Sequence, residues 1–259
     1  MAPTVGLIAA MGMEARPALR LLGPFERYPF RGYRAYRFAL SGADCILVES
    51  GMGIERATAA ARALLSAFEP LYLISFGIAG SIEQGVQIGD VIVATQVLLF
   101  ENGRLGKARP LGSLSESSCL AAEQALDASA ARLYTGTAIT TRGPQPTAPR
   151  LQGVSHPVLE METMGIARAA GEHSVRLLSI RSISDTPEAP LPTAMEALMD
   201  AEFNLRFANI ARICLRHPSK VLGLLRFSRN GMKAAENAAV AIAAILRDPL
   251  GAIPLPSHG

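Results

Sequence analysis

Short apolar runs recur along the chain between Val5 and Asp185, and each is bounded by glycine, proline or polar residues. Runs of this length indicate buried strands, which we expect at residues 5–10, 45–49, 71–76, 88–94, 133–141 and 175–183. Residue patterns compatible with helices lie between them, at residues 15–22, 57–68, 114–128 and 166–170. Strands that alternate with helices favour an α/β fold with a mostly parallel, doubly wound sheet.

Two segments depart from this alternation. Residues 27–40 alternate aromatic and basic side chains, which predicts an antiparallel hairpin with one solvated face. Nucleic-acid recognition is a weaker interpretation, because no second basic and aromatic element accompanies the first. Residues 195–247 are almost entirely compatible with helix, and Pro218 is the one hard break. We find no linker or repeat, and we predict a single domain, 1–259, with a helical C-terminal extension at about 192–247.

Composition narrows the class of protein. Hydrophobic residues make up 49% of the chain and the mean hydropathy is +0.25, so a large core can be buried. Charged residues reach only 18%, which hints at buried subunit contacts or an apolar partner. The net charge of +3 is too small to argue for nucleic acid as a partner. The sequence lacks the roughly 18 uninterrupted apolar residues of a transmembrane helix, and its N-terminus is typical of a first strand rather than of a signal peptide.

The three cysteines, Cys45, Cys119 and Cys214, are widely spaced and odd in number. Their spacing argues against a disulfide framework or a zinc site and favours a reducing compartment such as the cytoplasm. The four histidines form no cluster with metal-ligand spacing. We therefore expect neither a metal nor a cofactor.

Glycine-containing segments follow two of the expected strands. Ser50-Gly51-Met52-Gly53 follows one strand, and Gly77-Ile78-Ala79-Gly80 follows another. Turns of this kind can present backbone N–H groups to phosphate or sugar oxygens. Neither segment matches the dinucleotide fingerprint or the P-loop. Tight packing of a strand on a helix explains a single example equally well.

The stretch from Val158 to Asp185 carries acidic residues at both ends. It opens with Glu160 and Glu162 and ends in an apolar strand that delivers Ser184 and Asp185 at its carboxyl end. Ligands of open α/β sheets bind in the crevice beyond those strand ends. The alternative, in which Asp185 caps a helix, rests on the proline that follows two residues later.

A fourth acid, Glu14, follows the first expected strand, so the acids would form a polar rim at one edge of the sheet. Carboxylates without metal ligands, and without a Ser/His or Cys/His pair, indicate acid–base chemistry or sugar recognition. Cleavage of an N-ribosyl bond fits this set. One acid protonates the leaving base, another activates the nucleophile, and a third binds the ribose hydroxyls. The residues define this class of reactions without selecting one member.

Five motifs occur in an order that resembles a known family. They are Gly6 to Glu14, Ser50 to Gly53, Gly77 to Gly80 with the strand at Val86 to Val91, Glu160 to Glu162, and Arg181 to Asp185. The chain resembles the nucleoside phosphorylase and nucleosidase superfamily, most closely its methylthioadenosine/S-adenosylhomocysteine nucleosidase-like branch. The resemblance implies a three-layer α/β/α fold, a purine nucleoside as ligand and a homo-oligomer, commonly a dimer or hexamer.

The same resemblance implies roles for individual residues. Asp185 would donate a proton to purine N7, with Ser184 holding its carboxyl group, and Glu14 would orient or deprotonate the attacking water. The pKa of Asp185 would then have to rise through burial or neighbouring acids. Glu162 would bind the ribose hydroxyls and Met161 would pack on the sugar.

Other residues would support the site. Arg181 would lie near the acids, and Glu160 would have a supporting role. The substrate-binding segments would include Gly51, Gly53, Gly77, Ala79 and Gly80.

The chain departs from the family at several positions. Ile78 stands where relatives often have serine, and the usual aromatic beside the base has no clear counterpart after residues 133–141. Phosphate-using members carry an arginine before the second glycine segment, where this chain has Ile74-Ser75-Phe76. That difference favours water as the nucleophile. The resemblance to the nucleosidase-like branch implies adenine as the base. Phosphate stays open as a co-substrate, with Arg16, Arg56 or Arg142 as its ligand.

The segment after Asp185 is longer than the single closing helix of compact relatives. Basic residues punctuate its apolar ones, at Arg206, Arg212, Arg216, Lys220, Arg226, Arg229 and Lys233. Such a helix can lie on an anionic membrane surface, or it can pack on the core or on a partner subunit. The pattern resembles the hopanoid-associated phosphorylase branch, which implies a lipid-linked adenosine as substrate and peripheral contact with the inner face of the membrane. A non-catalytic nucleoside-binding module is a further hypothesis.

Overall fold

The computed structural model describes residues 2–143, 151, 153–191 and 218–247, with the backbone alone for 218–222. The strands are β1 (Thr4–Ala9), β2 (Glu26–Phe30), β3 (Tyr33–Leu40), β4 (Ala43–Glu49), β5 (Tyr72–Ser81), β6 (Val91–Glu101), β7 (Arg104–Leu105), β8 (Arg109–Pro110), β9 (Leu133–Thr141), β10 (Pro157–Glu160) and β11 (Arg176–Asp185). The helices are α1 (Gly12–Leu22), α2 (Ile54–Phe68), α3 (Glu116–Leu126), α4 (Thr163–Glu172) and α7 (Pro218–Ile245). A short 3-10 helix, Asp127–Ser129, follows α3.

All of these strands belong to one sheet, in the order β10-β9-β6-β11-β5-β1-β4-β3-β2, and β7 and β8 pair with β6. The neighbours β11, β5, β1 and β4 are parallel, and β6, β9 and β10 are parallel to one another. Antiparallel pairs include β6 with β11, β10 with β5, and the edge formed by β4, β3 and β2. The expected sheet, mostly parallel with an antiparallel hairpin near the N-terminus, is therefore confirmed.

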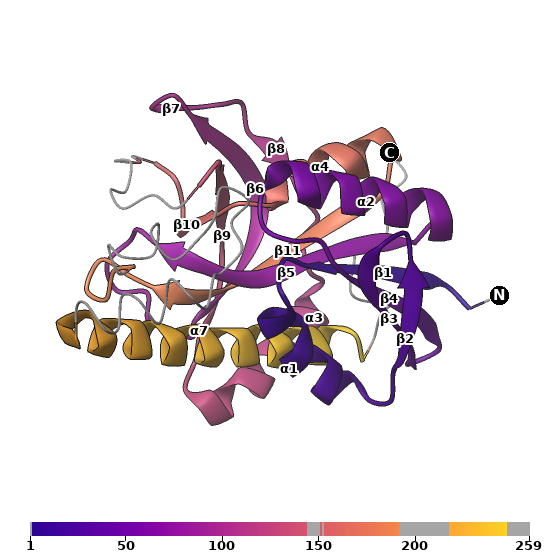
Figure 1. The fold of residues 1–259 in the computed structure, drawn as a ribbon, viewed down its shortest axis with the longest axis horizontal. Helices are drawn as coiled ribbons and strands as arrows, with labels where there is room; N and C mark the ends of the chain where they lie inside the picture. Colours follow the sequence, from indigo (N-terminus) through magenta and orange to yellow (C-terminus); the bar gives the residue numbers. More distant parts are fainter. Residues whose placement is uncertain (1, 144–150, 152, 192–217, 248–259) are drawn as a thin grey trace.

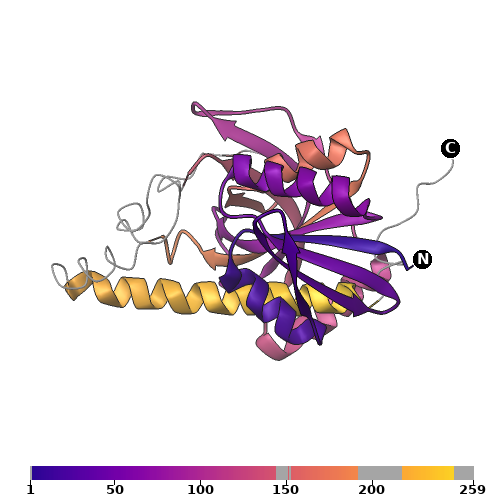
Figure 2. The same ribbon diagram turned by 45° about the vertical axis from the view of Figure 1, so that its right-hand side comes forward.

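Helices cover both faces of the sheet, as the two ribbon views show. Helices α1, α3 and α7 lie on one face, and α2 and α4 lie on the other (Figures 1 and 2). Each face has its own apolar core, and β1 contributes to both, with Leu7 in the first core and Ile8 in the second. Strands buried on both faces have continuous apolar runs, which is why these runs were visible in the sequence. The three-layer α/β/α architecture is confirmed.

Strand β5 corrects one expectation. The turn predicted at residues 77–80 is wrong, because β5 continues through Gly77 and Gly80 to Ser81. Both glycines make room for acidic side chains. A Cβ on Gly77 would collide with the carboxylate of Glu14, and a Cβ on Gly80 would lie 2.5 Å from Oδ2 of Asp185. The two glycines therefore let carboxylate side chains approach the backbone of a strand closely. In the sequence, glycines with this role look the same as glycines in a turn.

Other boundaries differ by a few residues. Helices α1 and α2 begin three residues earlier than expected, at Gly12 and Ile54, and β6 runs from Val91 to Glu101 instead of 88–94. The short strand β10 was not expected, because four residues beside two acids give little periodicity to read. The alternative in which Asp185 caps a helix is wrong for the described residues, since Thr186 and Ala189 exchange backbone hydrogen bonds in a turn.

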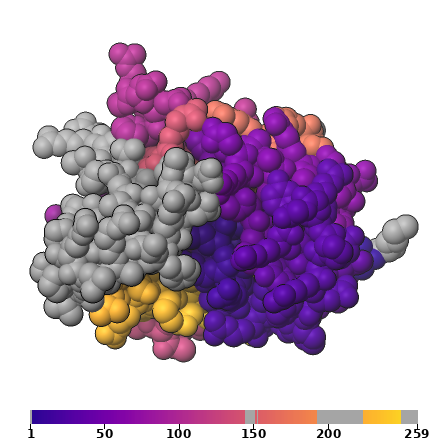
Figure 3. Space-filling model, in the orientation of Figure 1, coloured from indigo at the N-terminus to yellow at the C-terminus, as the bar shows by residue number. Residues whose placement is uncertain are grey.

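Helix α7 begins at the predicted break, Pro218, and its C-terminal half packs on the core. In the space-filling view its yellow residues adjoin the indigo N-terminal segment (Figure 3). The rest of the expected extension, 192–217, lies outside the described residues, as do Cys214 and three of its basic residues, Arg206, Arg212 and Arg216. The single-domain boundary stays a prediction. Among the helices that the structure describes, none is both long enough and apolar enough to span a membrane.

Candidate active site

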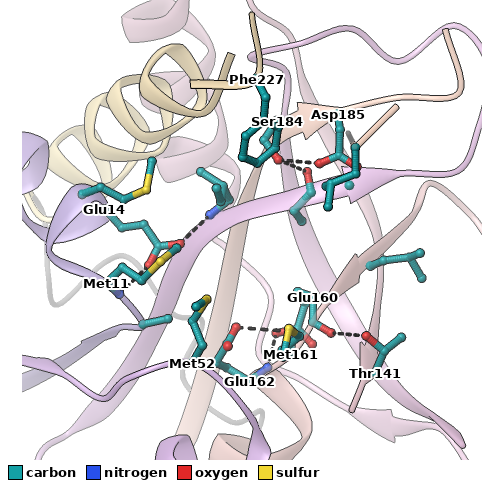
Figure 4. A pocket seen from close by; sticks show the side chains of 17 residues that line it. Met11, Glu14, Met52, Thr141, Glu160, Met161, Glu162, Ser184, Asp185 and Phe227 are labelled. Atoms are coloured by element: carbon teal, nitrogen blue, oxygen red, sulfur yellow. Dashed lines mark hydrogen bonds between the residues drawn. The ribbon is translucent and has the colours of Figure 1, made fainter. Parts of the chain in front are cut away.

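A cavity opens beyond the carboxyl ends of β1, β5, β10 and β11, where the first and last of the sequence motifs meet. It holds about 940 Å³ of empty space, counted out to its open mouth. Glu14, Glu160, Glu162 and Asp185 all line it (Figure 4).

Glu14 is the third residue of α1 and is almost fully buried. Its Oε1 accepts a hydrogen bond of 3.0 Å from the backbone N–H of Ile78 in β5, and Oε2 accepts one of 2.9 Å from Met11. The closely packed Gly77 leaves space for the carboxylate. Burial raises the pKa of Glu14 above its ordinary value, and the two backbone hydrogen bonds oppose the rise. The side chain is therefore held rigidly, and it gives up its proton at a higher pH than an exposed glutamate would.

Glu162 lies at the N-terminus of α4 and joins two helices. Its Oε1 accepts a hydrogen bond of 2.9 Å from the backbone N–H of Gly53, which precedes α2 and has φ of +100°. Burial, followed by the neighbouring charge of Glu160, raises the pKa of Glu162 to about 8. Gly53 thus contributes to the site through this backbone donor.

Glu160 has the opposite environment. One of its carboxylate oxygens, Oε2, accepts hydrogen bonds from the backbone N–H groups of Glu162 and Thr163, at 2.9 and 2.7 Å. The other, Oε1, accepts one from the hydroxyl of Thr140. These contacts fasten the start of α4 to β9, so Glu160 organises the backbone beneath the ligand cavity.

Arg181 is the cation that balances Glu160. Its side chain is only 2% exposed, and Nη2 lies 3.2 Å from Oε2 of Glu160, 2.7 Å from the hydroxyl of Ser75 and 2.9 Å from that of Thr163. Burial by itself would raise the pKa of Glu160, but Arg181 and the donated hydrogen bonds outweigh it and leave the pKa below its ordinary value. Glu160 therefore stays ionised, while its neighbour Glu162 takes up a proton readily.

Asp185 ends β11, where the pairing with β5 shifts register. The hydroxyl of Ser184 donates a hydrogen bond of 2.7 Å to Oδ1, and Gly80 leaves space for Oδ2. Burial raises the pKa of Asp185 above its ordinary value, although the hydrogen bond from Ser184 opposes the rise. The carboxyl group can therefore carry a proton into the cavity.

The structure brings most of the predicted site residues to this one cavity. Eight of them line it, namely Glu14, Ala79, Gly80, Glu160, Met161, Glu162, Ser184 and Asp185. Gly77 and Arg181 lie in a small pocket behind Glu14 and Glu162. Gly51 lies in a neighbouring cleft that also contains Tyr33 and Arg56.

Sequence reasoning missed the apolar part of the wall. It includes Met11, Met13, Met52, Leu191 and Phe227. Phe227 comes from α7, far along the chain, and lies beside Ser184 (Figure 4). Nothing local in the sequence distinguishes Phe227 from the other apolar residues of that helix, whereas Met11 and Met13 shortly precede Glu14, a predicted site residue.

In the described part of the chain, potential metal-ligating side chains do not cluster in threes. No three His, Cys, Asp or Glu side chains gather there in an arrangement that could hold a metal ion. The carboxylates of the cavity are instead satisfied by backbone N–H groups, hydroxyls and Arg181.

Comparison with known proteins places these features in a family. Residues 4–216 match the family described as Phosphorylase superfamily. A curated relative from Tolumonas auensis, named 5'-methylthioadenosine/S-adenosylhomocysteine nucleosidase, is 26% identical over 212 residues, which cover 76% of this chain and 92% of the relative.

Solved structures agree in fold. The nucleosidase of the same name from Colwellia psychrerythraea, in complex with adenine, has a TM-score of 0.70 at 20% identity and covers 95% of both chains. The one from Neisseria meningitidis, in complex with methylthio-immucillin-A, has a TM-score of 0.69 at 19% identity and covers 95% of this chain and 99% of its own. The match over most of the chain, together with the shared fold, shows that the protein belongs to the phosphorylase superfamily.

Proposed function

We propose that the chain is an enzyme that cleaves the N-ribosyl bond of an adenine nucleoside, with water as the nucleophile. One observation carries the proposal. Glu14, Glu162 and Asp185 surround a single cavity, and burial raises the pKa of each carboxyl group. Hydrolysis through an oxocarbenium-like transition state needs carboxyl groups in different protonation states around the sugar and its leaving group.

Asp185 is the general acid in this mechanism. As the bond between C1′ and the purine nitrogen breaks, its electron pair moves into the base, and the Asp185 carboxyl donates a proton to N7. The raised pKa keeps the carboxyl group protonated nearer to neutral pH. Ser184 holds its Oδ1 in place, at 2.7 Å.

Glu162 binds the ribose. Its Oε1 is held by Gly53, and the carboxylate accepts hydrogen bonds from the ribose hydroxyls once it is ionised. Met161, the next residue in the cavity wall, packs on the sugar. The negative charge of Glu162 also stabilises the positive charge that develops on the ribosyl ring.

Glu14 prepares the nucleophile. The backbone N–H groups of Ile78 and Met11 hold its two oxygens, so the carboxylate can orient a water molecule toward C1′. The water oxygen forms the new bond to C1′, and Glu14 accepts the proton that the water loses. Burial raises the pKa of Glu14 toward the working pH, which suits a general base.

Two observations favour water over phosphate. Among the described residues that line the cavity, none is a lysine or an arginine. Arg142 is bound to Glu55, at 2.8 Å, and to Glu101, while Arg56 lines the neighbouring cleft and Arg16 is exposed on α1. Among the described residues of the cavity wall, a phosphate ion would meet carboxylates and no lysine or arginine to offset its charge.

The apolar wall indicates the substrate class. Met11, Met13, Met52, Leu191 and Phe227 would face a substituent at the 5′ position. A charged 5′ group would lose water there without gaining a partner, so the wall favours an apolar one. A 5′-thioether such as that of methylthioadenosine has this chemistry, and the name of the Tolumonas auensis relative supports it.

The phosphate comparison tests the reaction. Purified protein is incubated with methylthioadenosine, adenosine, or an adenosine with a longer apolar 5′ group, with and without inorganic phosphate. We expect free adenine and a free reducing sugar at the same rate in both conditions. If a ribose 1-phosphate product forms only when phosphate is added, the nucleophile is phosphate and not water. If no nucleoside is cleaved but the analogues bind, the chain is a binding module.

A lipid-linked adenosine, such as an adenosylated hopane, is a second candidate substrate. Leu225 and Met232 on α7 are each 56% exposed, and Arg226 and Arg229 are exposed beside them. Because the same helix carries Phe227, a membrane bound to α7 would lie close to the cavity. In this form of the proposal, the enzyme works in the cytoplasm at the inner face of the membrane.

We also propose that the chain forms a homo-oligomer. The low charged fraction, 18%, supports extensive subunit contacts. Light scattering during size-exclusion chromatography should give a mass that is a multiple of 27.4 kDa. A mass equal to one chain across the concentrations used in the activity assays would refute this part.

A further inference from the structure

Helix α7 packs on the core through very small side chains. Its buried residues are mostly alanines, at positions 234, 235, 238, 239, 241 and 244. Helices usually fix their relative position by packing the ridges of one into the grooves of the other. Alanine ridges are shallow, so apolar packing by itself restricts sliding along the α7 axis only weakly.

One polar side chain interrupts this alanine surface. Asn237 is 4% exposed, and among the described residues of α7 no other polar side chain is buried. Its Nδ2 donates a hydrogen bond of 2.8 Å to the carbonyl oxygen of Gly89. A buried amide that loses its acceptor is strongly disfavoured. Only one position of the helix along its axis satisfies this group.

Gly89 lies in direct contact with α7 and has no side chain to obstruct it. Its φ is +95°, and a Cβ there would lie 2.8 Å from Nδ2 of Asn237 and 2.9 Å from Cε of Lys233. Glycine therefore permits both the backbone conformation and the close approach of α7.

The same turn is bonded to the strand that carries the acid. The N–H of Gly89 donates to the carbonyl of Ile183, at 2.8 Å, and the N–H of Ile183 donates to the backbone carbonyl of Asp90, at 2.9 Å. The hydroxyl of Ser182 also donates to the Gly89 carbonyl, at 3.1 Å. Asn237 thus anchors α7 to β11 at Ser182 and Ile183, one to three residues before Ser184 and Asp185.

The N-terminal half of α7 reaches the cavity. A Cβ on Gly231 would lie 3.3 Å from Cε of Met13, and Phe227, one turn earlier, lines the cavity beside Ser184 (Figure 4). Ten residues of helix, about 15 Å, separate Phe227 from Asn237. A slide or rotation of α7 at Asn237 would therefore move the ring of Phe227 out of its place.

We propose that Asn237 is a positioning residue that fixes α7 along its axis and thereby holds Phe227 in the cavity wall. The effect on substrate rests on the proposed function, because Phe227 then contacts the nucleoside or its 5′ substituent. Asn237 acts through Phe227 and touches no reacting atom.

A double-mutant cycle on the full-length protein tests this pairing. Asn237→Ala should raise KM for methylthioadenosine about tenfold and leave kcat within about threefold, because Asp185 and Glu14 keep their places. Phe227→Ala should raise KM by a similar factor. In the Phe227→Ala background, Asn237→Ala should add nothing further, since the group it positions is gone. A full tenfold effect of Asn237→Ala in that background would overturn the proposal.

Two further variants separate positioning from general stability. Asn237→Leu keeps the side-chain volume and leaves Gly89 its bond from Ser182, so the protein should fold while KM still rises. Ile245→Ala weakens α7 packing at the far end of the helix without releasing Gly89. It should lower Tm at least as much as Asn237→Leu with KM unchanged. If KM rises as much for Ile245→Ala as for Asn237→Leu, Asn237 contributes only to general stability and the proposal is refuted.

A readout without catalysis distinguishes failure of the proposal from failure of the proposed function. 4-Fluorophenylalanine at position 227 gives a ¹⁹F resonance that reports the surroundings of that ring. Asn237→Leu should shift or broaden this resonance, and Ile245→Ala should not. If the wild type cleaves no nucleoside, the proposed function fails while the resonance still decides the positioning role. An unchanged resonance in Asn237→Leu would overturn it.

Discussion

Carboxyl groups of the same chemical type take different states in this cavity because their partners differ. Glu160 has a buried guanidinium and several donors, so it remains ionised. Glu162 has one backbone donor besides its own neighbour and lies beside that charge, so its pKa rises to about 8. Burial raises the pKa of Asp185, and only the hydrogen bond from the Ser184 hydroxyl opposes this rise. The proposed mechanism gives these carboxyl groups separate roles on the basis of their different environments.

The Asp185→Asn variant tests the general acid. An amide fills the same space and keeps the bond from Ser184, but it cannot deliver a proton to the base. We expect kcat to fall at least about 100-fold, with KM changed much less. Steady-state release of adenine from methylthioadenosine measures both values. Full turnover by Asp185→Asn would remove this residue from the mechanism.

The raised pKa of Glu162 predicts how stability depends on pH. Between the ordinary value of 4.5 and about 8, the folded state holds a proton that the unfolded state has released. The free energy of unfolding contributed by this group therefore falls as pH rises through that window. Glu162→Gln has no such proton.

The difference in Tm between Glu162→Gln and the wild type should thus grow from pH 5 to pH 9. A gain of about 1 kcal/mol corresponds to roughly 2–4 °C for a domain of this size. Differential scanning calorimetry in matched buffers measures it. A Tm difference that stays constant over this range would contradict the raised pKa.

At the scale of elements, β5 explains how the acids fit. Its glycines have the same sequence signal as a turn, yet they lie in a strand and face the side chains of Glu14 and Asp185. Those side chains come from α1 and β11, so no local pattern around Gly77 or Gly80 could reveal what each glycine accommodates. Only the pairing of β5 with β1 and β11 brings them together.

Gly80→Ala should therefore damage activity more than stability. The added Cβ would meet Oδ2 of Asp185 at 2.5 Å, and the end of that side chain can move aside at little cost to folding. A displacement of about 1 Å can reduce kcat about 100-fold. Gly223→Ala, on α7 with nothing within 4 Å of its new Cβ, is the matched control and should leave kcat unchanged. Normal turnover of Gly80→Ala would show that Asp185 does not depend on this space.

At the scale of the whole molecule, the cavity depends on segments far apart in the chain. The first motif supplies Glu14, the middle of the chain supplies Glu162, and α7 supplies Phe227. The same helix exposes Leu225, Met232 and basic residues, so one element joins the cavity wall to a candidate membrane surface.

Charge reversal on α7 tests the membrane contact. Arg226→Glu combined with Arg229→Glu should weaken sedimentation with phosphatidylglycerol vesicles, since each basic residue near an anionic surface contributes about 1 kcal/mol. Turnover of soluble methylthioadenosine should stay unchanged, because neither side chain lines the cavity. Lack of vesicle binding by the wild type at low salt would exclude this surface as a membrane contact.

The α/β alternation, the order of the five motifs and the acids that end the strands can all be read from the sequence alone. Strands buried on both faces leave continuous apolar runs, and the acids stand out after them, so this information is local. Tertiary structure decided the rest. The pKa values depend on burial and on partners such as Arg181, and the apolar wall includes a ring from α7. The roles of Gly77 and Gly80 in β5 and of Asn237 in α7 depend on the side chains and the carbonyl group that packing brings against them.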